Sequence, residues 1–450
     1  MIAAYKEHSQ FILILAILYV IGVWAGPVIY ILYPLFLFLF GLRFRYFELF
    51  IIGVWTLMLA DYVPVENATH DDLQFAKDLK NLVPLSLFAF FVRDRISFQP
   101  YSKLILYFIP FLAIATLGLT DSINLTVGMQ KTVSYILMML VVPMYVNKLN
   151  LDDGEYFWKA LITFLIGMLS IGLVLRFAAP DIAMLKGGRY KGVLGNPNGL
   201  GVFLNLIFIL WIVVKEMRLA TFTKKENVYI FLVIVISLVW SGSRNGMMSI
   251  VLFYVVHRIV KINWFLAVIA ILIFVFFNDQ IFDVLLTIIE FFGLEDYFRV
   301  DTIEEGSGRK IAWVFAWSEI QNYYFIGGGF GHDEHIMRPN YYWLSKKGHE
   351  GGVHNSYFSM WFDSGILGVI SYFGALIVIM FRQMKFNYIV IAFVVSLCFN
   401  VTYESWLVAS LNPFTIIYLT ILTIIIANFA PNVEVEHVNE TDSNSNEESK

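Results

Sequence analysis

The chain has 450 residues, of which 59% are hydrophobic and 15% are charged, and its mean hydropathy is strongly positive. A soluble domain is closer to half apolar and a quarter charged, so this composition excludes a soluble globular protein and predicts a polytopic membrane protein. The net charge of −4 indicates no particular partner. The single cysteine, Cys398, excludes an internal disulfide and a cysteine-based metal site.

Apolar segments long enough to cross a bilayer, roughly 17–25 residues or somewhat fewer, follow one another along most of the chain. We predict an all-α transmembrane bundle with about 12 to 14 spans, the count depending on how many of the shorter segments cross the membrane. The segments are 10–25, 27–41, 47–62, 82–94, 103–119, 129–146, 156–177, 198–214, 227–241, 245–260, 263–278, 356–381, 387–402 and 405–428.

Basic residues in the connecting loops predict the orientation of the bundle, because loops rich in lysine and arginine stay in the cytoplasm. If Lys6 is cytoplasmic, every second loop falls on the same side and carries basic residues. Both termini are then expected in the cytoplasm. The loops 63–81, 178–197 and 278–352 are expected on the outer face.

This pattern divides the chain into four parts. We expect a transmembrane bundle over 1–277 with about eleven spans. A large outer loop with amphipathic helices follows over 278–355, and C-terminal transmembrane helices occupy 356–430. The end, 431–450, is rich in Asn, Ser and Glu, which is typical of a disordered cytoplasmic tail.

The first group of candidate residues precedes the apolar segment 198–214. The sequence Asn-Pro-Asn-Gly at 196–199 is a turn signal in which Asn196 or Asn198 can cap the next helix, and a tight outer turn explains it most simply. Arg189 and Lys191 stand just before this turn. Cations beside the free N–H groups of a helix N-terminus also make an anion site.

A short outer turn, Ser241–Gly246, joins two spans and contains Arg244. An arginine at the membrane rim can extend towards lipid phosphates. The alternative is that Arg244 points inward and binds a diphosphate or a sugar, because a charge at this depth is costly unless it is used.

A predicted helix begins at Arg309 and Lys310 in the large loop, with Ser307 as its cap. One face carries Arg309, Trp313, Ala316, Trp317 and Ile320. An amphipathic helix on the bilayer surface, with its tryptophans at the interface, is the simple interpretation. It is compatible with Arg309 serving a site at the helix N-terminus. A second interfacial helix is expected over 281–294.

His354, followed by Asn355, is the strongest catalytic candidate, because an imidazole can take up a proton near neutral pH. The alternative is a His-Asn pair that caps a helix and anchors it at the interface. Asp363, two turns into the following segment, is a carboxylate within the membrane and could pair with one of the arginines.

Two further patterns in the loop are weak. The run Gly-Gly-Gly-Phe-Gly at 327–331 lacks the Lys-Ser/Thr of a phosphate loop, and we interpret it as a hinge that returns the loop to the membrane. His349 and His354 are one residue too far apart for the His-Glu-x-x-His zinc helix, and two glycines lie between them. A metalloprotease is therefore disfavoured.

Taken in chain order, these motifs resemble the O-antigen ligase/polymerase superfamily of bacterial membrane glycosyltransferases. The resemblance covers roughly residues 185–370 and includes the large outer loop. It is carried by Arg189 with Gly195–Gly199, Ser241–Arg244, Gly308-Arg309 with Trp313, Gly327-x-Gly-x-Gly331, and His354-Asn355-x-Tyr357.

The resemblance implies transfer of a glycan from undecaprenyl diphosphate to an acceptor hydroxyl at the outer face of the inner membrane, with no nucleotide sugar and no metal. It also implies that Arg189, Arg244 and Arg309 bind the diphosphate and that His354 acts on the acceptor. The other candidate substrate contacts are Lys191, Lys310, Asn196, Asn198, Asn355, Trp313 and Trp317.

The chemistry agrees with this implication. Negative charge builds up on the leaving diphosphate, where guanidinium groups can replace a metal ion. A general base typically contributes about 10²–10⁴-fold to such a transfer. The expected function is a polysaccharide polymerase, which extends a glycan on a new lipid-linked repeat unit. A ligase acting on lipid A core is the alternative, and a lipid-linked glycan transporter is the second alternative. Membrane lipid and a chain-length regulator are candidate partners, and no nucleic acid is expected.

Overall fold

The computed structural model describes residues 2–24, 28–43, 45–62, 79–94, 103–185, 188–267, 309–349 and 351–427, together with residues 269, 276, 287, 290 and 291. Several predicted features lie wholly or mostly outside the described residues. These are the apolar segment 263–278, the interfacial helix 281–294, the cap Ser307 and the tail 431–450.

Most of the described residues are helical, which confirms the all-α prediction. Within the described ranges the only extended pairing is one bridge between Met184 and Tyr190. The elements are α1 (Ile2–Trp24), α2 (Val28–Leu42), α3 (Tyr46–Tyr62), α5 (Leu82–Arg93), α6 (Lys103–Leu117), η2 (Gly118–Asp121), α7 (Leu125–Asp152), α8 (Glu155–Ala178), α9 (Pro180–Ala183), α10 (Pro197–Glu216), α11 (Lys224–Ser241), α12 (Arg244–Ile262), α17 (Arg309–Ile320), η4 (Gln321–Tyr323), α18 (His332–Ser345), α19 (Ser356–Gln383), α20 (Ile389–Tyr403), η5 (Trp406–Val408) and α21 (Pro413–Ala427).

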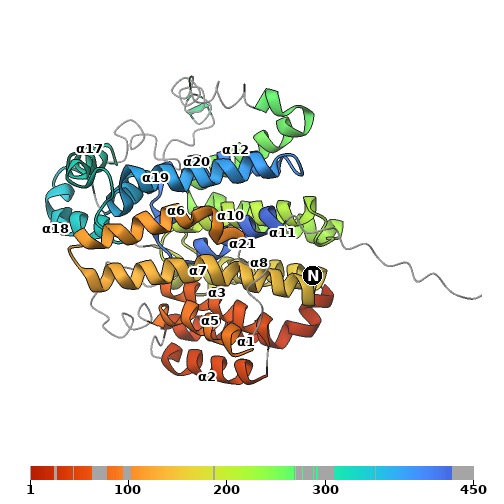
Figure 1. Cartoon of the computed structure of the whole chain (residues 1–450). Coiled ribbons are helices and arrows are strands. Elements are labelled where there is room, and N and C mark those ends of the chain that lie inside the picture. Colours follow the sequence, from red (N-terminus) through yellow and green to blue (C-terminus); the bar gives the residue numbers. More distant parts are fainter. Residues whose placement is uncertain are drawn as a thin grey trace, which may run out of the picture.

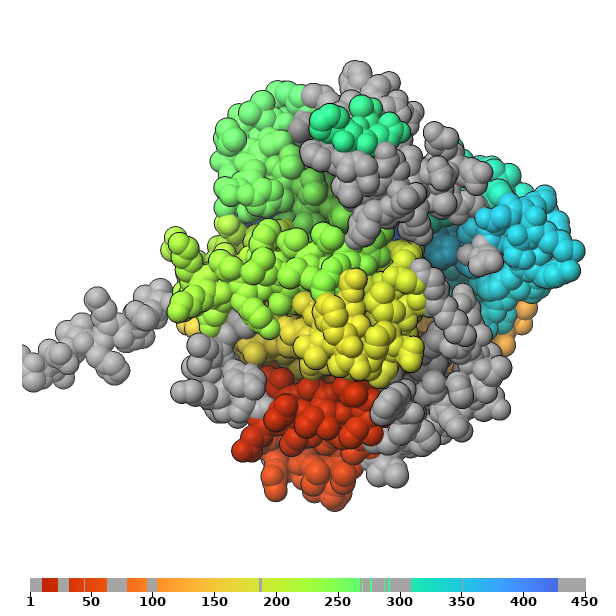
Figure 2. All heavy atoms as spheres, turned by 180° about the vertical axis from the view of Figure 1, so that it is seen from behind, coloured from red at the N-terminus to blue at the C-terminus, as the bar shows by residue number. Residues whose placement is uncertain are grey.

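The long helices run roughly side by side, and α17 and α18 sit at one end of the bundle, which we call the loop end (Figure 1). The N-terminus lies at the opposite end. Helix α10 packs against α12 and α21, and α21 packs against α7, so α10 and α21 occupy the centre. Seen from behind, the N-terminal helices form one edge of the molecule (Figure 2).

Six of the described helices are long and apolar enough to cross a membrane. They are Lys103–Asp121, Leu125–Asp152, Glu155–Ala178, Pro197–Glu216, Arg244–Ile262 and Ser356–Gln383. Shorter apolar helices occupy the N-terminal segments and the C-terminal pair. The chain is therefore a multi-pass membrane protein, because helices satisfy their own backbone hydrogen bonds in lipid.

The last predicted apolar segment, 405–428, is helical over only part of its length. Its helix, α21, begins at Pro413, where proline is favourable because the first N–H of a helix has no partner. Asn412 caps it, since its Oδ1 accepts a hydrogen bond from the Thr415 N–H at 2.7 Å. Residues 404–412 instead form a connection at the loop end that contains η5.

The glycine run at 327–331 packs against a break in α19. Gly365 has φ = 65° within that helix, and the Gly328 and Gly329 N–H groups donate to the Phe362 and Asp363 carbonyls, both at 2.9 Å. The run is thus a packed backbone contact that seats the loop on the bundle.

The predicted pairing of Asp363 with an arginine is wrong. Its Oδ1 accepts hydrogen bonds from the backbone N–H groups of His332 and Asp333, at 2.9 and 3.3 Å. These are the first residues of α18, so Asp363 satisfies donors that a helix N-terminus leaves free. A salt bridge between Lys131 of α7 and Glu334 of α18, at 2.7 Å, holds the same helix to the bundle.

We predict that Gly327→Ala lowers the melting temperature of the purified protein by about 5 °C, because a side chain there is strained and overpacks. Gly327 has φ = 78°, and an added Cβ would lie 2.4 Å from the Ser364 nitrogen. Gly374→Ala is the control, because nothing lies within 4 Å of its Cβ position. Equal melting temperatures for the two variants would show that the glycine run does not need this close approach.

Candidate functional site

Two helix N-termini meet at the loop end. Asn196 caps α10, its Oδ1 accepting from the Gly199 N–H at 2.7 Å, and Ser243 caps α12 through the Gly246 N–H at 3.4 Å. A Cβ on Gly246 would lie 2.7 Å from the Gly201 Cα, so these glycines permit a very close helix crossing. The positive ends of both helix dipoles are thereby directed to one place, which favours an anion.

Arg189 bridges the start of α10 and the end of α11. Its Nη2 donates to Asn198 Oδ1 and to the Ser241 carbonyl, both at 3.0 Å. The guanidinium therefore lies beside the first turn of α10, as the sequence predicted, and it is half-buried.

The N-terminal helices hold the loop that carries Arg189. Tyr19 of α1 donates to the Val193 carbonyl, and Tyr62 of α3 donates to the Ile182 carbonyl at 3.2 Å. Asp61 accepts a hydrogen bond from the Gly195 N–H at 3.2 Å. The first spans thus contribute to the site by fixing this loop, a role that the sequence did not indicate.

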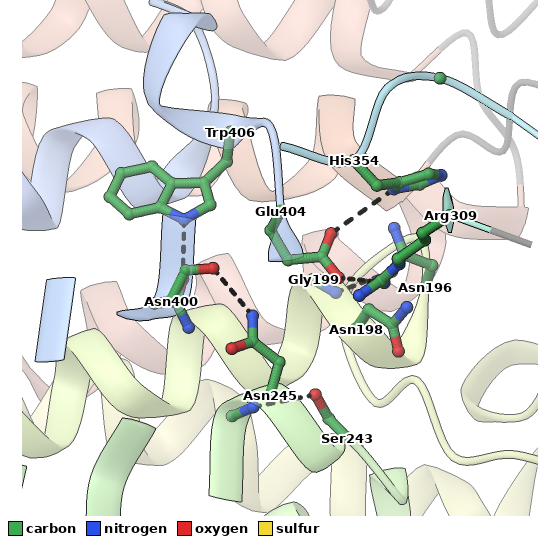
Figure 3. Close-up of polar contacts among 12 residues, drawn as sticks. Asn196, Asn198, Gly199, Ser243, Asn245, Arg309, His354, Asn400, Glu404 and Trp406 are labelled. Atoms are coloured by element: carbon green, nitrogen blue, oxygen red, sulfur yellow. Dashed lines mark hydrogen bonds and ion pairs between the residues drawn. The ribbon is translucent and has the colours of Figure 1, made fainter. Parts of the chain in front are cut away.

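The central contact of the site joins Arg309, Glu404 and His354 (Figure 3). Arg309 Nη2 lies 3.0 Å from Glu404 Oε1, and His354 Nδ1 lies 3.8 Å from Glu404 Oε2. Glu404 is only 12% exposed, Arg309 18% and His354 33%. One carboxylate therefore contacts both Arg309, which is predicted to bind the diphosphate, and His354, which is predicted to act on the acceptor. Asn196 and Asn198 lie in the same region.

The backbone at His354 is strained in a way that positions its ring. His354 has φ = 48°, which is unusual for a residue with a side chain and is often found at functional sites. A Cβ on Gly351 would lie 2.8 Å from His354 Nε2, so this glycine leaves room beside that nitrogen. Asn355 caps α19, its Oδ1 accepting from the Tyr357 and Phe358 N–H groups at 2.9 and 3.1 Å.

A network of neutral polar side chains lies next to Glu404 at the end of α20. The Trp406 indole donates to Asn400 Oδ1 at 2.9 Å, and Asn400 Nδ2 donates to Ser249 Oγ at 3.0 Å. Asn245 Nδ2 donates to the Asn400 carbonyl at 3.0 Å. These bonds join the start of α12, which carries Arg244, to the end of α20, which carries Glu404 (Figure 3).

The remaining predicted residues lie in different places. Arg244 is the first residue of α12 and is half-buried, whereas Lys310 is exposed on α17. Trp313 donates to the Val353 carbonyl at 3.0 Å, and Trp317 is 45% exposed.

Lys191 is turned towards α3. It is buried, and its ammonium lies 4.1 Å from the centre of the Tyr62 ring. Burial lowers the pKa of Lys191 to about 8, and the nearby Asp61 carboxylate opposes that shift.

Glu404 is the main residue that sequence reasoning missed. The available signal was a carboxylate between the apolar segments 387–402 and 405–428, on the side predicted to be outer. Among the described residues no group of three or more His, Cys, Asp or Glu could hold a metal ion. His349, for example, is buried with its Nε2 2.9 Å from the Gly352 carbonyl.

The arrangement can bind an anion and move a proton. Arginines from separate segments stand near the N-termini of α10 and α12, which suits a diphosphate. A carboxylate beside one imidazole nitrogen orients the ring and leaves the other nitrogen to face a substrate.

The protein-family model described as O-antigen ligase matches residues 229–373. The matched range includes Arg244, Arg309 and His354 but neither Arg189 nor Glu404. This match confirms the predicted resemblance to the O-antigen ligase/polymerase superfamily. Searches of the curated proteins and of the solved structures gave no match.

We predict that Glu404→Gln lowers the rate of the reaction at this site by about 10²-fold, because both Arg309 and His354 lose their charged partner. Glu334→Gln is the matched control. Glu334 lies on α18 outside the site, and it pairs with Lys131 of α7 and with Arg338 of α18. The rates and melting temperatures of the two variants would be compared with those of the native protein. A Glu404→Gln protein with a normal rate would make this carboxylate purely structural.

Proposed function

We propose that this protein transfers a glycan from undecaprenyl diphosphate to a hydroxyl group of an acceptor. The observation that carries the proposal is the contact of Glu404 with both Arg309 and His354, beside the N-termini of α10 and α12. The family match supports a glycosyltransferase of the O-antigen ligase/polymerase type.

Arg309 and Arg189 would bind the diphosphate, with Arg244 at the start of α12 as a third cation. The diphosphate carries more negative charge than the Glu404 carboxylate. Each guanidinium can also donate two parallel hydrogen bonds to a pair of its oxygens. As the bond between the anomeric carbon and the phosphate oxygen breaks, charge grows on the leaving group. Cations already fixed in place stabilise that charge without reorganisation.

His354 would accept the proton of the acceptor hydroxyl through Nε2, the nitrogen beside Gly351. The acceptor oxygen forms the new bond to the anomeric carbon while undecaprenyl diphosphate leaves. Glu404, on the Nδ1 side, stabilises the imidazolium until the proton passes to solvent. Asn355 holds the start of α19 and so fixes the position of the histidine.

We place the loop end on the periplasmic face of the inner membrane, with both termini in the cytoplasm and residues 278–355 as the large outer loop. The alternation of basic loops supports this orientation. The position of the N-terminus at the opposite end of the bundle agrees with it.

For the acceptor we propose a second lipid-linked repeat unit, which makes the reaction a polymerisation whose only required partner is the carrier lipid. The description of the matched family favours the alternative, a ligase that transfers the glycan to lipid A core. A transporter of lipid-linked glycan would need charges along a central cavity, whereas the charged residues of this site gather at the loop end.

Reconstitution in liposomes with the host's lipid-linked repeat unit, with and without lipid A core, tests this proposal. We expect a ladder of longer glycans on the undecaprenyl carrier, and we expect His354→Ala or Arg309→Gln to reduce it by about 10²-fold or more. His335→Ala and Arg338→Gln, on α18, are controls that should leave the ladder unchanged.

The other outcomes separate the candidate functions. Glycan found only on the core would make the protein a ligase. Transport of the repeat unit without any new glycosidic bond would contradict an enzymatic function.

A further inference from the structure

A second group of polar side chains lies at the loop end, between α8 and α11. Arg176 is in the last turn of α8, and its guanidinium carbon lies 3.8 Å from the centre of the Trp240 ring. Its Nη1 is buried and has no hydrogen-bond partner. Among the described residues, no carboxylate forms a salt bridge with Arg176, so its charge is not neutralised by the part of the chain that the structure defines.

Two buried hydroxyl groups accompany this arginine. Tyr190 is 1% exposed and Ser237 0% exposed. Their two hydroxyl groups lie close to each other, and neither has another hydrogen-bond partner among the described residues. The Tyr190 ring centre lies 5.8 Å from that of Trp240, so Tyr190 and Arg176 both contact the same indole. Burial raises the pKa of Tyr190, while the Ser237 hydroxyl and the Arg176 guanidinium oppose that rise. The three groups come from α8, the loop before α10, and α11.

A buried hydrogen-bond donor without an acceptor lowers the stability of the fold by about 1–3 kcal/mol. Native proteins therefore rarely contain such donors. One cation and two hydroxyls can all be satisfied by the oxygens of a single anion. The guanidinium of Arg176, which lies over the Trp240 ring, carries its N–H groups in a planar fork, and this geometry suits a phosphate. The group therefore has the composition of a phosphate subsite.

The surroundings indicate that the phosphate arrives from the bilayer. Val174 and Phe177 of α8 are 64% and 74% exposed, and Val239 of α11 is 44% exposed, as expected for side chains that face lipid. The surface view from behind shows the segments around residues 155–195 and 200–240 next to each other on this face (Figure 2). A ligand between α8 and α11 can therefore keep its apolar tail in the membrane.

We propose that Arg176, Tyr190 and Ser237 bind a phosphate group of undecaprenyl diphosphate at the lipid-facing rim, outside the site formed by Arg309, Glu404 and His354. The inference rests on the proposed function for the identity of the lipid. Trp240 is followed by Ser241, whose carbonyl accepts from Arg189. The subsite and Arg189 thus lie on the same turn at the end of α11, and a carrier lipid could pass directly from one to the other.

A local photo-crosslink tests this proposal in the full-length protein. Val239→p-benzoylphenylalanine places a photoreactive group beside Trp240, and the yield of adduct with added undecaprenyl diphosphate is measured. We expect Arg176→Gln to lower the yield about tenfold, since hydrogen bonds to a charged group are lost. Tyr190→Phe removes one hydroxyl and keeps the ring, and it should lower the yield several-fold.

Arg258→Gln is the matched control, because Arg258 lies on the Tyr254 ring near the other end of α12. Excess phosphatidylglycerol distinguishes the two sources of a lipid phosphate. If it abolishes the adduct equally in native and variant proteins, or if Arg176→Gln leaves the yield unchanged, the diphosphate subsite is overturned.

Glycan transfer decides the proposed function separately. Transfer by the native protein together with an unchanged crosslink in Arg176→Gln would overturn only the rim subsite. A weakened crosslink in a protein that transfers no glycan would overturn only the proposed reaction.

Discussion

The carboxylate of Glu404 is the constraint on which the site depends. It lies 3.0 Å from Arg309 of the large loop and 3.8 Å from His354 at the start of α19. Removing one partner of such a buried pair leaves an uncompensated charge, which is far more costly than the pair itself is stabilising. The contact therefore keeps the loop on the bundle, and a competing anion that releases Arg309 would change the environment of His354 at the same time.

The polar side chains next to Glu404 at the end of α20 hold this region in place without adding charge. The Asn400 side chain is hydrogen-bonded to Trp406 and Ser249, and its backbone carbonyl accepts from Asn245. Gly201 and Gly246 let α10 and α12 cross closely. Neutral amides can be fully hydrogen-bonded within a membrane protein at low cost, whereas additional charges could not. Charge is thus concentrated where an anionic substrate would bind, and the scaffold beneath it is polar but neutral.

The sequence predicted the helices well because lipid forces the backbone to satisfy its own hydrogen bonds, so apolar length translates directly into helix. His354 could be selected because it stands beside an apolar segment, and Arg309 because it stands at the start of a predicted amphipathic helix in the outer loop. Glu404 could not be linked to them, since its partners are 50 and 95 residues away. Asp363 was misassigned because the N–H groups that donate to it, at the N-terminus of α18, are brought next to it only by the fold.

A cryo-EM structure of the protein with undecaprenyl diphosphate bound in a lipid nanodisc would test the central claim most directly. We expect the diphosphate within hydrogen-bond distance of the Arg309 guanidinium, next to the first turns of α10 and α12, with Glu404 retained beside His354. A diphosphate bound elsewhere while Arg309 remains paired with Glu404 would contradict a substrate-binding role for Arg309 and make the pair purely structural.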